Sequence, residues 1–331
     1  VYLFPILKKM KKLFFKIIIY TILILLVLEI WVRVFHLTKD YPVRYIDEFG
    51  VEKWMPNQDG FSVTGNRRQN FSEYHINNFG YNSYREYNPS KDKVEIALVG
   101  DSFVEGFHQN YYNSTGKKIE KILNGIEVYE FGYAGYDLAD ELHLIHQYQS
   151  TFNLIDHVFL GLKFENDLTR GKYGILKDRM KLESPLYRSL RQIKLLVYLQ
   201  HIGAFDAARE LTRKILSLGQ QKNNIKNPET NDSKNKRYLV YIQNFESLIN
   251  TYGYDKTRFT FLIDKEKTPF IFLNYLDLHD FKYLDFSETL KQSKRPTTLI
   301  YDMHWNNHGR NLVAKRISQY IQTKIYGTSL E

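Results

Sequence analysis

Residues 94–103 read VEIALVGDSF. The first six are mostly apolar and rich in β-branched side chains, which is typical of a short strand buried inside a sheet. A serine that directly follows such a strand lies at the carboxyl edge of an α/β sheet, where ligands bind. A helix beginning there would aim the Ser102 backbone N–H outward, with the helix dipole behind it, toward a developing oxyanion. Ser102 is therefore a candidate nucleophile. The alternative is a simple helix cap, a common role for Asp or Ser in such a turn.

The same strand pattern recurs along the chain and alternates with helical patterns. We expect strands at 94–99, 126–131, 157–163, 258–263 and 282–286, and helices at about 115–124, 137–150 and 307–324. Strands that alternate with helices imply a mainly parallel sheet covered by helices on both faces. The predicted fold is therefore α/β, a three-layer sandwich.

A second candidate motif lies near the carboxyl end, where residues 302–306 read DMHWN. Hydrolysis by a serine requires an imidazole base and a carboxylate that orients it. With one residue between them, the Asp302 carboxylate can reach back to the His304 imidazole. The alternative is a structural Asp–His pair in a loop.

Two further residues complete a recognisable set. Gly135 follows the strand at 126–131, and Asn166 follows the strand at 157–163. With Ser102 and the Asp302/His304 pair, they stand in the order of the conserved blocks of the GDSL/SGNH hydrolase superfamily, which this chain resembles over about residues 93–170 and 255–327. The resemblance implies the flavodoxin-like SGNH fold. It also implies Ser102 as nucleophile, His304 as base and Asp302 as its orienting carboxylate, with an oxyanion hole formed by Ser102, Gly135 and Asn166.

The chain departs from the family pattern in two places. Phe164 stands where members usually have a glycine two residues before Asn166, so the local backbone could differ. One residue separates Asp302 from His304, where many members have two. The shorter form, followed by Trp305 and Asn306, resembles the membrane-anchored branch of the family.

The amino-terminal region is basic and then apolar. Lysines stand at positions 8, 9, 11, 12 and 16, and residues 13–35 are long enough to span a bilayer, which needs about 20 residues. The uncharged core, Ile17–Leu28, is short. A cleaved signal peptide requires small residues at its cleavage site, and none are visible after Glu29; a buried helix of a soluble protein is the other alternative. We expect 1–12 to be a basic cytoplasmic terminus, 13–35 an uncleaved signal anchor, and the remainder to lie outside the cytosol, in the periplasm or beyond.

The body divides into an irregular lead-in at 36–92 and a hydrolase-like domain at 93–327. A helical insertion at about 171–254 interrupts the alternation, and we expect it to form a lid or substrate wall. Within it, Gln220–Arg237 is polar and predicts an exposed loop, whereas Tyr238–Tyr252 predicts a helix.

Composition narrows the function classes. The chain has 331 residues, 43% of them hydrophobic, so it can build a sizeable core. It has no cysteine, which excludes disulfides and thiol catalysis. Much of the net charge of +9 flanks the apolar segment, and we expect no nucleic-acid partner. We expect no cofactor and no metal. Metal sites at Asp302/His304/His308 or at His143/His146 are the alternatives.

The triad and the family resemblance imply a membrane-tethered serine esterase that hydrolyses an O-acyl ester, most plausibly an O-acetyl group. The resemblance to anchored, envelope-facing members implies that a cell-envelope glycan carries this ester. The partners of the esterase would be the acylated glycan or a small ester and, through residues 13–35, the lipid bilayer. Two alternatives remain open. The same groups could transfer an acyl group to a polysaccharide hydroxyl, or the fold could persist as a non-catalytic glycan-binding or assembly factor.

Overall fold

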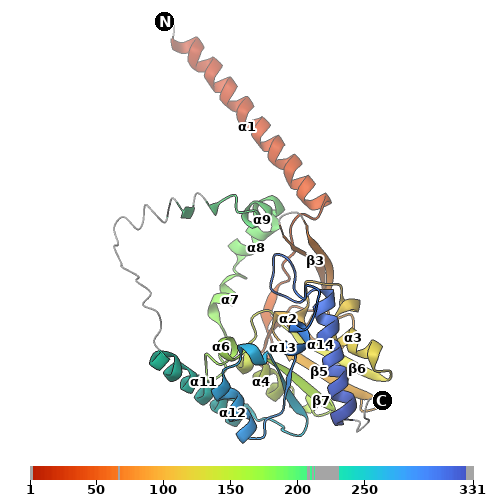
Figure 1. Ribbon diagram of the computed structural model, residues 1–331. Helices are drawn as coiled ribbons and strands as arrows, with labels where there is room; N and C mark the ends of the chain where they lie inside the picture. Colours follow the sequence, from red (N-terminus) through yellow and green to blue (C-terminus); the bar gives the residue numbers. More distant parts are fainter. Residues whose placement is uncertain (1–2, 66–67, 207–208, 211, 213–230, 326–331) are drawn as a thin grey trace.

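The computed structural model describes residues 3–65, 68–206, 209–210, 212 and 231–325. A five-stranded parallel sheet with the order β6-β5-β7-β8-β9 forms its centre (Figure 1). Its strands are β5 (Val94–Gly100), β6 (Ile126–Gly132), β7 (His157–Leu162), β8 (Phe259–Ile263) and β9 (Tyr283–Asp285). All five predicted strands are present to within about two residues, and the predicted α/β class is confirmed.

Strand β5 is buried on both faces, because its side chains alternate between two cores. Ala97 and Val99 face a core built with helices α4 (Leu138–Gln147), α11 (Asn231–Tyr252) and α12 (Phe270–Leu278). Ile96 and Leu98 face the opposite core, built with α3 (Thr115–Ile122) and α14 (Asn307–Tyr320). Helices therefore cover both faces of the sheet, as the alternation predicts.

Short helices and turns complete the domain. They are α2 (Ser102–Glu105), η1 (Tyr111–Asn113), α5 (Gln149–Phe152), α6 (Phe164–Asp167), η2 (Lys265–Lys267) and α13 (Ser287–Lys291). A π-helical turn, η3 (Ile321–Ile325), continues α14, so the predicted final helix at 307–324 ends in a different geometry. The predicted helix at 137–150 is divided into α4 and α5 at Tyr148.

The lead-in contributes two antiparallel pairs, β1 (Arg44–Ile46) with β2 (Glu52–Trp54), and β3 (Gln58–Thr64) with β4 (Asn70–Ile76). Trp54, Tyr74 and Tyr81 belong to the same apolar core as the β6 residue Phe131. The lead-in therefore packs against the central domain.

Between β7 and β8 the chain forms α7 (Lys177–Lys181), α8 (Pro185–Gln192), α9 (Lys194–His201) and α11. The loop predicted at Gln220–Arg237 is wrong for residues 231–237, which belong to α11. Residues 220–230 lie outside the described part of the chain. Lysine and arginine are good helix formers, so a polar segment continues a helix when one face remains in water.

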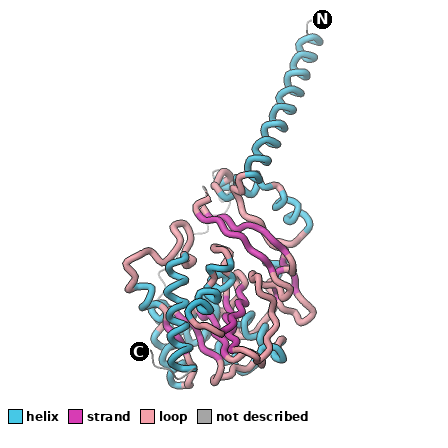
Figure 2. Tube along the Cα trace, turned by 90° about the vertical axis from the view of Figure 1, so that its right-hand side faces the viewer, coloured by secondary structure: helices cyan, strands magenta, loops and turns pink. Residues whose placement is uncertain are grey.

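Helix α1 (Leu3–Val34) projects from the body in both views (Figures 1 and 2). Its segment Met10–Val34 has 25 residues and a mean hydropathy of 2.6, enough to cross a membrane by length and composition, and its apolar window is exposed. The predicted span at 13–35 falls within α1 except for Phe35.

Candidate active site

Ser102 lies at the start of α2, where the chain leaves β5. The Asp101 side chain caps this helix by accepting the Phe103 N–H at 3.0 Å. Gly106 ends it in the left-handed region, with φ at 68°. Asp101 therefore has the capping role that was the alternative for Ser102, and the Ser102 hydroxyl remains available for another partner.

The close packing of β6 against α2 depends on a glycine. A Cβ atom at Gly132 would lie 1.8 Å from the backbone nitrogen of Glu105. Arg310 of α14, which is fully buried, donates from Nη1 to the Phe103 carbonyl at 2.8 Å. Burial lowers the pKa of Arg310 to about 10, which leaves the guanidinium charged at neutral pH. Helix α2 is thus held between β6 and α14.

His304 lies beside Ser102, although 202 positions separate them in the sequence. Its Nε2 is 2.6 Å from the Ser102 Oγ. Its Nδ1 contacts the Asp302 carboxylate, and its backbone N–H donates to the same carboxylate at 2.9 Å. The turn at 302–304 therefore closes on itself, and the structure brings all three predicted residues into direct contact.

The loop that carries His304 is fixed at its end by Asn306. The Asn306 Oδ1 accepts the Gly309 N–H at 2.9 Å and so caps α14. Its amide nitrogen donates to the carbonyls of Pro296 at 2.8 Å and Thr298 at 3.0 Å. One side chain thus joins the loop to the helix that follows it.

Asp302 is held ionised. Burial acts to raise the pKa of this carboxyl group, but the two hydrogen bonds from His304 and the positive charge that the imidazole can carry outweigh it. The net shift of the Asp302 pKa is downward. A carboxylate in this position favours the imidazole tautomer that presents Nε2 to Ser102 as an acceptor.

A second histidine, which the sequence analysis did not single out, joins the group. The His108 Nε2 is 3.2 Å from Asp302 Oδ2, and its ring stacks on that of His304 with centroids 4.0 Å apart. Burial and the neighbouring His304 lower the pKa of His108 to about 4, so it is neutral at physiological pH. In the sequence, the only sign that His108 lies near Ser102 is its position two residues after Gly106, which ends α2.

Gly135 and Asn166 reach the same edge of the sheet from the strands on either side of β5. Gly135 follows β6 with φ at 91°, in the region that favours glycine. Asn166 lies in α6, directly after β7. Gly135 and Asn166 follow the two strands adjacent to β5 in the sheet. Direct side-chain contacts join Ser102 to His304 and His304 to Asp302.

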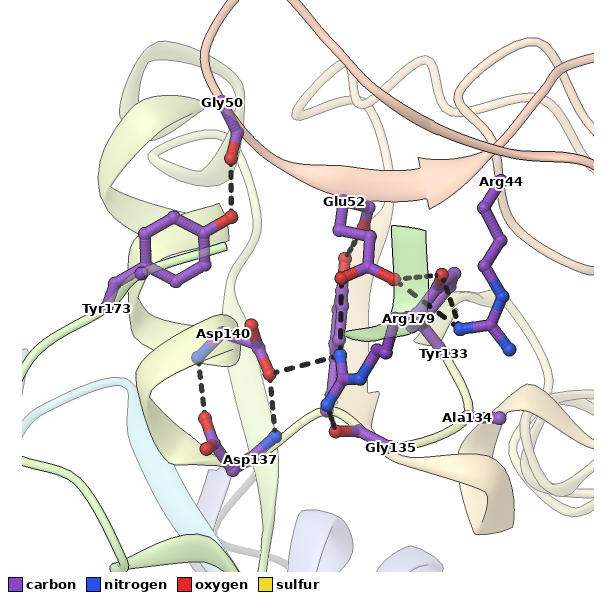
Figure 3. A network of polar contacts seen from close by, with 12 residues as sticks. Arg44, Gly50, Glu52, Tyr133, Ala134, Gly135, Asp137, Asp140, Tyr173 and Arg179 are labelled. Carbon is purple, nitrogen blue, oxygen red and sulfur yellow. Dashed lines mark hydrogen bonds and ion pairs between the residues drawn. The ribbon is translucent and has the colours of Figure 1, made fainter. Parts of the chain in front are cut away.

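Figure 3 shows the polar network that holds the Gly135 loop. Arg179 of α7 donates to the Gly135 carbonyl and forms ion pairs with Glu52 at 3.4 Å and Asp140 at 3.7 Å. The Tyr133 hydroxyl donates to Glu52 Oε1 at 2.5 Å. The network therefore connects the lead-in, the loop after β6 and the insertion.

Glu105 ties the same loop to α2. Its carboxylate accepts the Ala134 N–H at 3.0 Å and the Trp54 indole N–H at 2.8 Å. Burial raises the pKa of Glu105 to about 7, although both hydrogen bonds act in the opposite direction.

Phe164, where the family pattern has a glycine, points into the core. Its side chain is only 2% exposed and packs against the rings of Phe272 at 4.9 Å and Tyr238 at 5.1 Å. The turn is closed instead by the Asp167 carboxylate, which accepts the Lys163 N–H at 2.6 Å. The Phe164 side chain therefore packs in the core, and Asn166 remains exposed at the carboxyl edge of the sheet.

A cavity of about 1010 Å³ adjoins the site; Ser102 and His304 are not among its lining residues, although the chain neighbours of both are. Its lining includes Asp101, Phe103, Asn166, Met303 and Trp305. Its lining combines apolar and aromatic side chains with about as many polar and charged ones.

The two metal sites weighed from the sequence are not assembled. His308 contacts the Ser293 hydroxyl at 2.9 Å. His143 stacks on Tyr173 with ring centroids 3.7 Å apart, whereas His146 contacts the Tyr252 carbonyl at 3.2 Å.

Among the described residues, the group with ligand spacing is His108, Asp302 and His304. Both His304 nitrogens already have partners there, Ser102 and Asp302, so a metal would have to displace one of them.

The chain matches no protein-family model and no curated protein. Among solved structures it is similar to a lipolytic G-D-S-L family protein from Veillonella parvula, at 15% identity and a TM-score of 0.36, covering 70% of this chain and 98% of that one. A lipase/acylhydrolase from Enterococcus faecalis matches at 10% identity and 0.37, covering 70% and 96%. A carbohydrate acetylesterase family member from Sinorhizobium meliloti matches at 12% and 0.32, covering 70% and 98%. These likenesses are distant, so the chemistry of this chain has to be argued from its own residues.

Proposed function

We propose that this protein is a membrane-tethered serine esterase of the GDSL/SGNH type. One observation carries the proposal: the Ser102 Oγ lies 2.6 Å from His304 Nε2, while the opposite ring nitrogen contacts Asp302. A hydroxyl, an imidazole and a carboxylate in this relay are the groups that acyl transfer through a serine requires.

In the first half of the reaction, the Ser102 Oγ attacks the ester carbonyl carbon and its proton passes to His304 Nε2. The carbonyl electron pair moves to the oxygen and forms a tetrahedral oxyanion. When the oxyanion collapses, the bond to the alcohol breaks and His304 returns the proton to the leaving oxygen. Water then repeats these steps on the acyl-enzyme and releases the acid.

Three donors are assigned to the oxyanion, namely the backbone N–H groups of Ser102 and Gly135 and the side-chain amide of Asn166. Their positions at the ends of β5, β6 and β7 support the assignment. The fold orients such donors before the negative charge forms, so they stabilise it without rearranging. Removing one typically lowers turnover by about 10²–10³-fold.

His108 is assigned a positioning role. As a neutral imidazole it can donate its Nε2–H to the Asp302 oxygen that faces away from His304. This contact would fix the carboxylate plane and, through it, the orientation of the His304 ring.

For the substrate, we favour an O-acetyl or another short acyl group on a glycan. The cavity of about 1010 Å³ that adjoins the site, with Asn166 and both chain neighbours of Ser102 in its lining, is much larger than an acetyl group and leaves room for a sugar that carries the ester. Aromatic side chains at its wall, Phe103 and Trp305, can pack against the apolar face of a sugar ring.

For the cellular arrangement, we propose that α1 is an uncleaved signal anchor. The lysines at positions 8, 9, 11, 12 and 16 favour a cytoplasmic amino end, and the segment Met10–Val34 has the length and hydropathy of a span. The catalytic domain would then lie outside the cytosol, on the side of the envelope glycans.

The direct test is hydrolysis of p-nitrophenyl acetate and release of acetate from an acetylated polysaccharide. The full-length protein should act on at least one of them, and Ser102→Ala should reduce turnover by at least about 10³-fold. Ser150→Ala, at an exposed position of α5, should retain wild-type turnover. Equal activity of the wild type and Ser102→Ala on both substrates would refute the proposal.

A further inference from the structure

An apolar stripe lies on the surface of the insertion. Leu186 and Leu190 lie four residues apart on one face of α8, and Leu182 and Ile193 flank this helix just outside its two ends. Their exposed fractions are 37%, 68%, 38% and 48%. We call these four residues the α8 stripe. A contiguous exposed apolar face of this kind marks an interaction surface.

The segment that follows the stripe is attached to the candidate membrane helix. The Glu29 carboxylate of α1 accepts the backbone N–H groups of Lys194 at 3.0 Å and Leu195 at 2.6 Å, and so caps the amino end of α9. Arg33 donates to the Gln192 carbonyl at 2.5 Å. Figure 1 shows α8 and α9 beside the end of α1 that enters the body.

These contacts place residues 192–195 of the insertion beside Glu29 and Arg33 of α1. The uncharged run Ile17–Leu28 has 12 residues, about 18 Å of helix, whereas the hydrocarbon core is about 30 Å thick. The span must therefore extend toward Glu29, Trp31 and Arg33, the residue types found at a membrane interface. Because Glu29 and Arg33 contact residues 192–195, that part of the insertion lies at the same depth.

We propose that the α8 stripe rests on the outer surface of the same phospholipid bilayer that α1 crosses. This inference depends on the proposed membrane tether and adds a second contact to it. The opposite face of α8 carries Arg188, which is exposed and would face water and the lipid headgroups. A short helix with one apolar and one basic face, whose carboxyl end lies at the depth of the interface, has the composition of a membrane-surface helix.

The second contact would have a consequence for the active site. A domain attached through a single helix can swing about its attachment, whereas a second bilayer contact holds the domain in one orientation. The same segment carries Arg179, which donates to the Gly135 carbonyl three residues before the stripe begins. Bilayer contact and the loop after β6 thus belong to one continuous stretch of chain.

The chain has no cysteine, so single-cysteine variants of the full-length protein can test this directly. Leu25→Cys, Leu186→Cys, Arg188→Cys and Leu278→Cys would be labelled with an environment-sensitive NBD dye. The labelled proteins would be reconstituted in vesicles of phosphatidylcholine and phosphatidylglycerol that contain nitroxide-labelled lipids. Leu278, 71% exposed at the end of α12, is a matched remote control, and Arg188 is the control on the opposite face of the same helix.

We expect strong nitroxide quenching at position 25, clear quenching with a blue-shifted emission at 186, weaker quenching at 188 and none at 278. Quenching at 25 without quenching at 186 would overturn this inference and leave the membrane tether intact. Absence of quenching at 25 would refute the tether and this inference together. A disulfide-linked dimer of the unlabelled Leu186→Cys protein, together with no lipid quenching of the labelled protein at 186, would assign the stripe to a second copy of the chain and overturn the inference.

Discussion

At the scale of single residues, the proposed chemistry depends on a relay that joins four side chains. Ser102 contacts His304, His304 contacts Asp302, and Asp302 contacts His108. The lowered pKa values of Asp302 and His108 are consistent with each other, because the carboxylate remains charged while the outer imidazole remains neutral. Asp302 and His108 are therefore in the protonation states that the hydrogen bond between them requires.

His108→Ala should lower the kcat for ester hydrolysis by roughly 10-fold. The Asp302 carboxylate would lose the hydrogen bond from His108, and a hydrogen bond to a charged group contributes about 1.5–3 kcal/mol. The KM should change little, since His108 acts through Asp302. His108→Gln, whose amide can donate to the same oxygen, should recover part of the loss. Steady-state kinetics of these variants and of His146→Ala, an exposed control, would check this. Equal losses in His108→Ala and His108→Gln would contradict a positioning role.

A chelator tests the same cluster in another way. His108, Asp302 and His304 have the spacing of a metal site, but both His304 nitrogens are committed to other partners. Overnight dialysis against EDTA should leave ester hydrolysis unchanged, and added Zn²⁺ should inhibit by competing for the imidazoles. Loss of activity in EDTA, with recovery on addition of a divalent metal, would favour a metal-dependent mechanism instead.

Part of this site could be predicted from the sequence, for a physical reason. Ser102 follows a strongly apolar strand, and Asp302 and His304 form a local pair, so short sequence patterns identify them. His108 has no such pattern. Its contact with Asp302 is made by two loops 194 positions apart, and only the folded chain brings them together.

At the scale of elements, Glu105 connects three of them: α2, the loop after β6, and β2 through Trp54. Its raised pKa, about 7 in the folded protein against an ordinary value of 4.5, has a defined effect on stability. Between these two pH values the folded state keeps a proton that the unfolded state releases. The contribution of Glu105 to stability is therefore fully present at low pH and is lost as the pH rises through about 7.

Glu105→Gln should remove this pH dependence, because the amide oxygen still accepts a hydrogen bond but cannot ionise. From pH 5 to pH 8, the free energy of unfolding of the wild type should fall relative to that of the variant by up to about 3 kcal/mol. Urea denaturation at several pH values would measure the difference. Glu73→Gln, at an exposed site on β4, serves as the control and should follow the wild type. Parallel pH profiles for the wild type and Glu105→Gln would show that the buried carboxyl group does not titrate as described.

Elements differ in how well the sequence predicts them. Strands β5, β7 and β8 are short, mainly apolar runs, so their positions follow from the pattern. Helix α12 was not predicted, because its sequence FIFLNYLDL is apolar on nearly every side and shows no helical periodicity. The early start of α11 was missed because its first residues are polar and exposed, so the sequence shows no apolar helical stripe there.

At the scale of the whole molecule, one apolar helix projects from an α/β body whose insertion contacts the base of that helix. The contact between Glu29 and α9 could not be predicted, since it joins residues 165 positions apart. The sequence does predict the direction of insertion, because lysines cluster before the apolar segment.

This topology makes a prediction about labelling. In spheroplasts of a Gram-negative host, a membrane-impermeant maleimide should label Leu239→Cys, a position 51% exposed on α11. Lys12→Cys, at the basic end of α1, should be labelled only after lysis. Labelling of Lys12→Cys before lysis, with protection of Leu239→Cys, would place the catalytic domain in the cytosol and rule out an envelope glycan as substrate.

The nucleophilicity of Ser102 can be measured with no knowledge of the natural ester. The full-length protein would be treated with a fluorophosphonate probe, and its digested peptides would be mapped by mass spectrometry. One adduct is expected, on the Ser102 oxygen, that is lost in Ser102→Ala and forms at least about 10²-fold more slowly in His304→Gln. An adduct on another residue, or no reaction by a folded wild-type protein, would contradict the proposed serine mechanism.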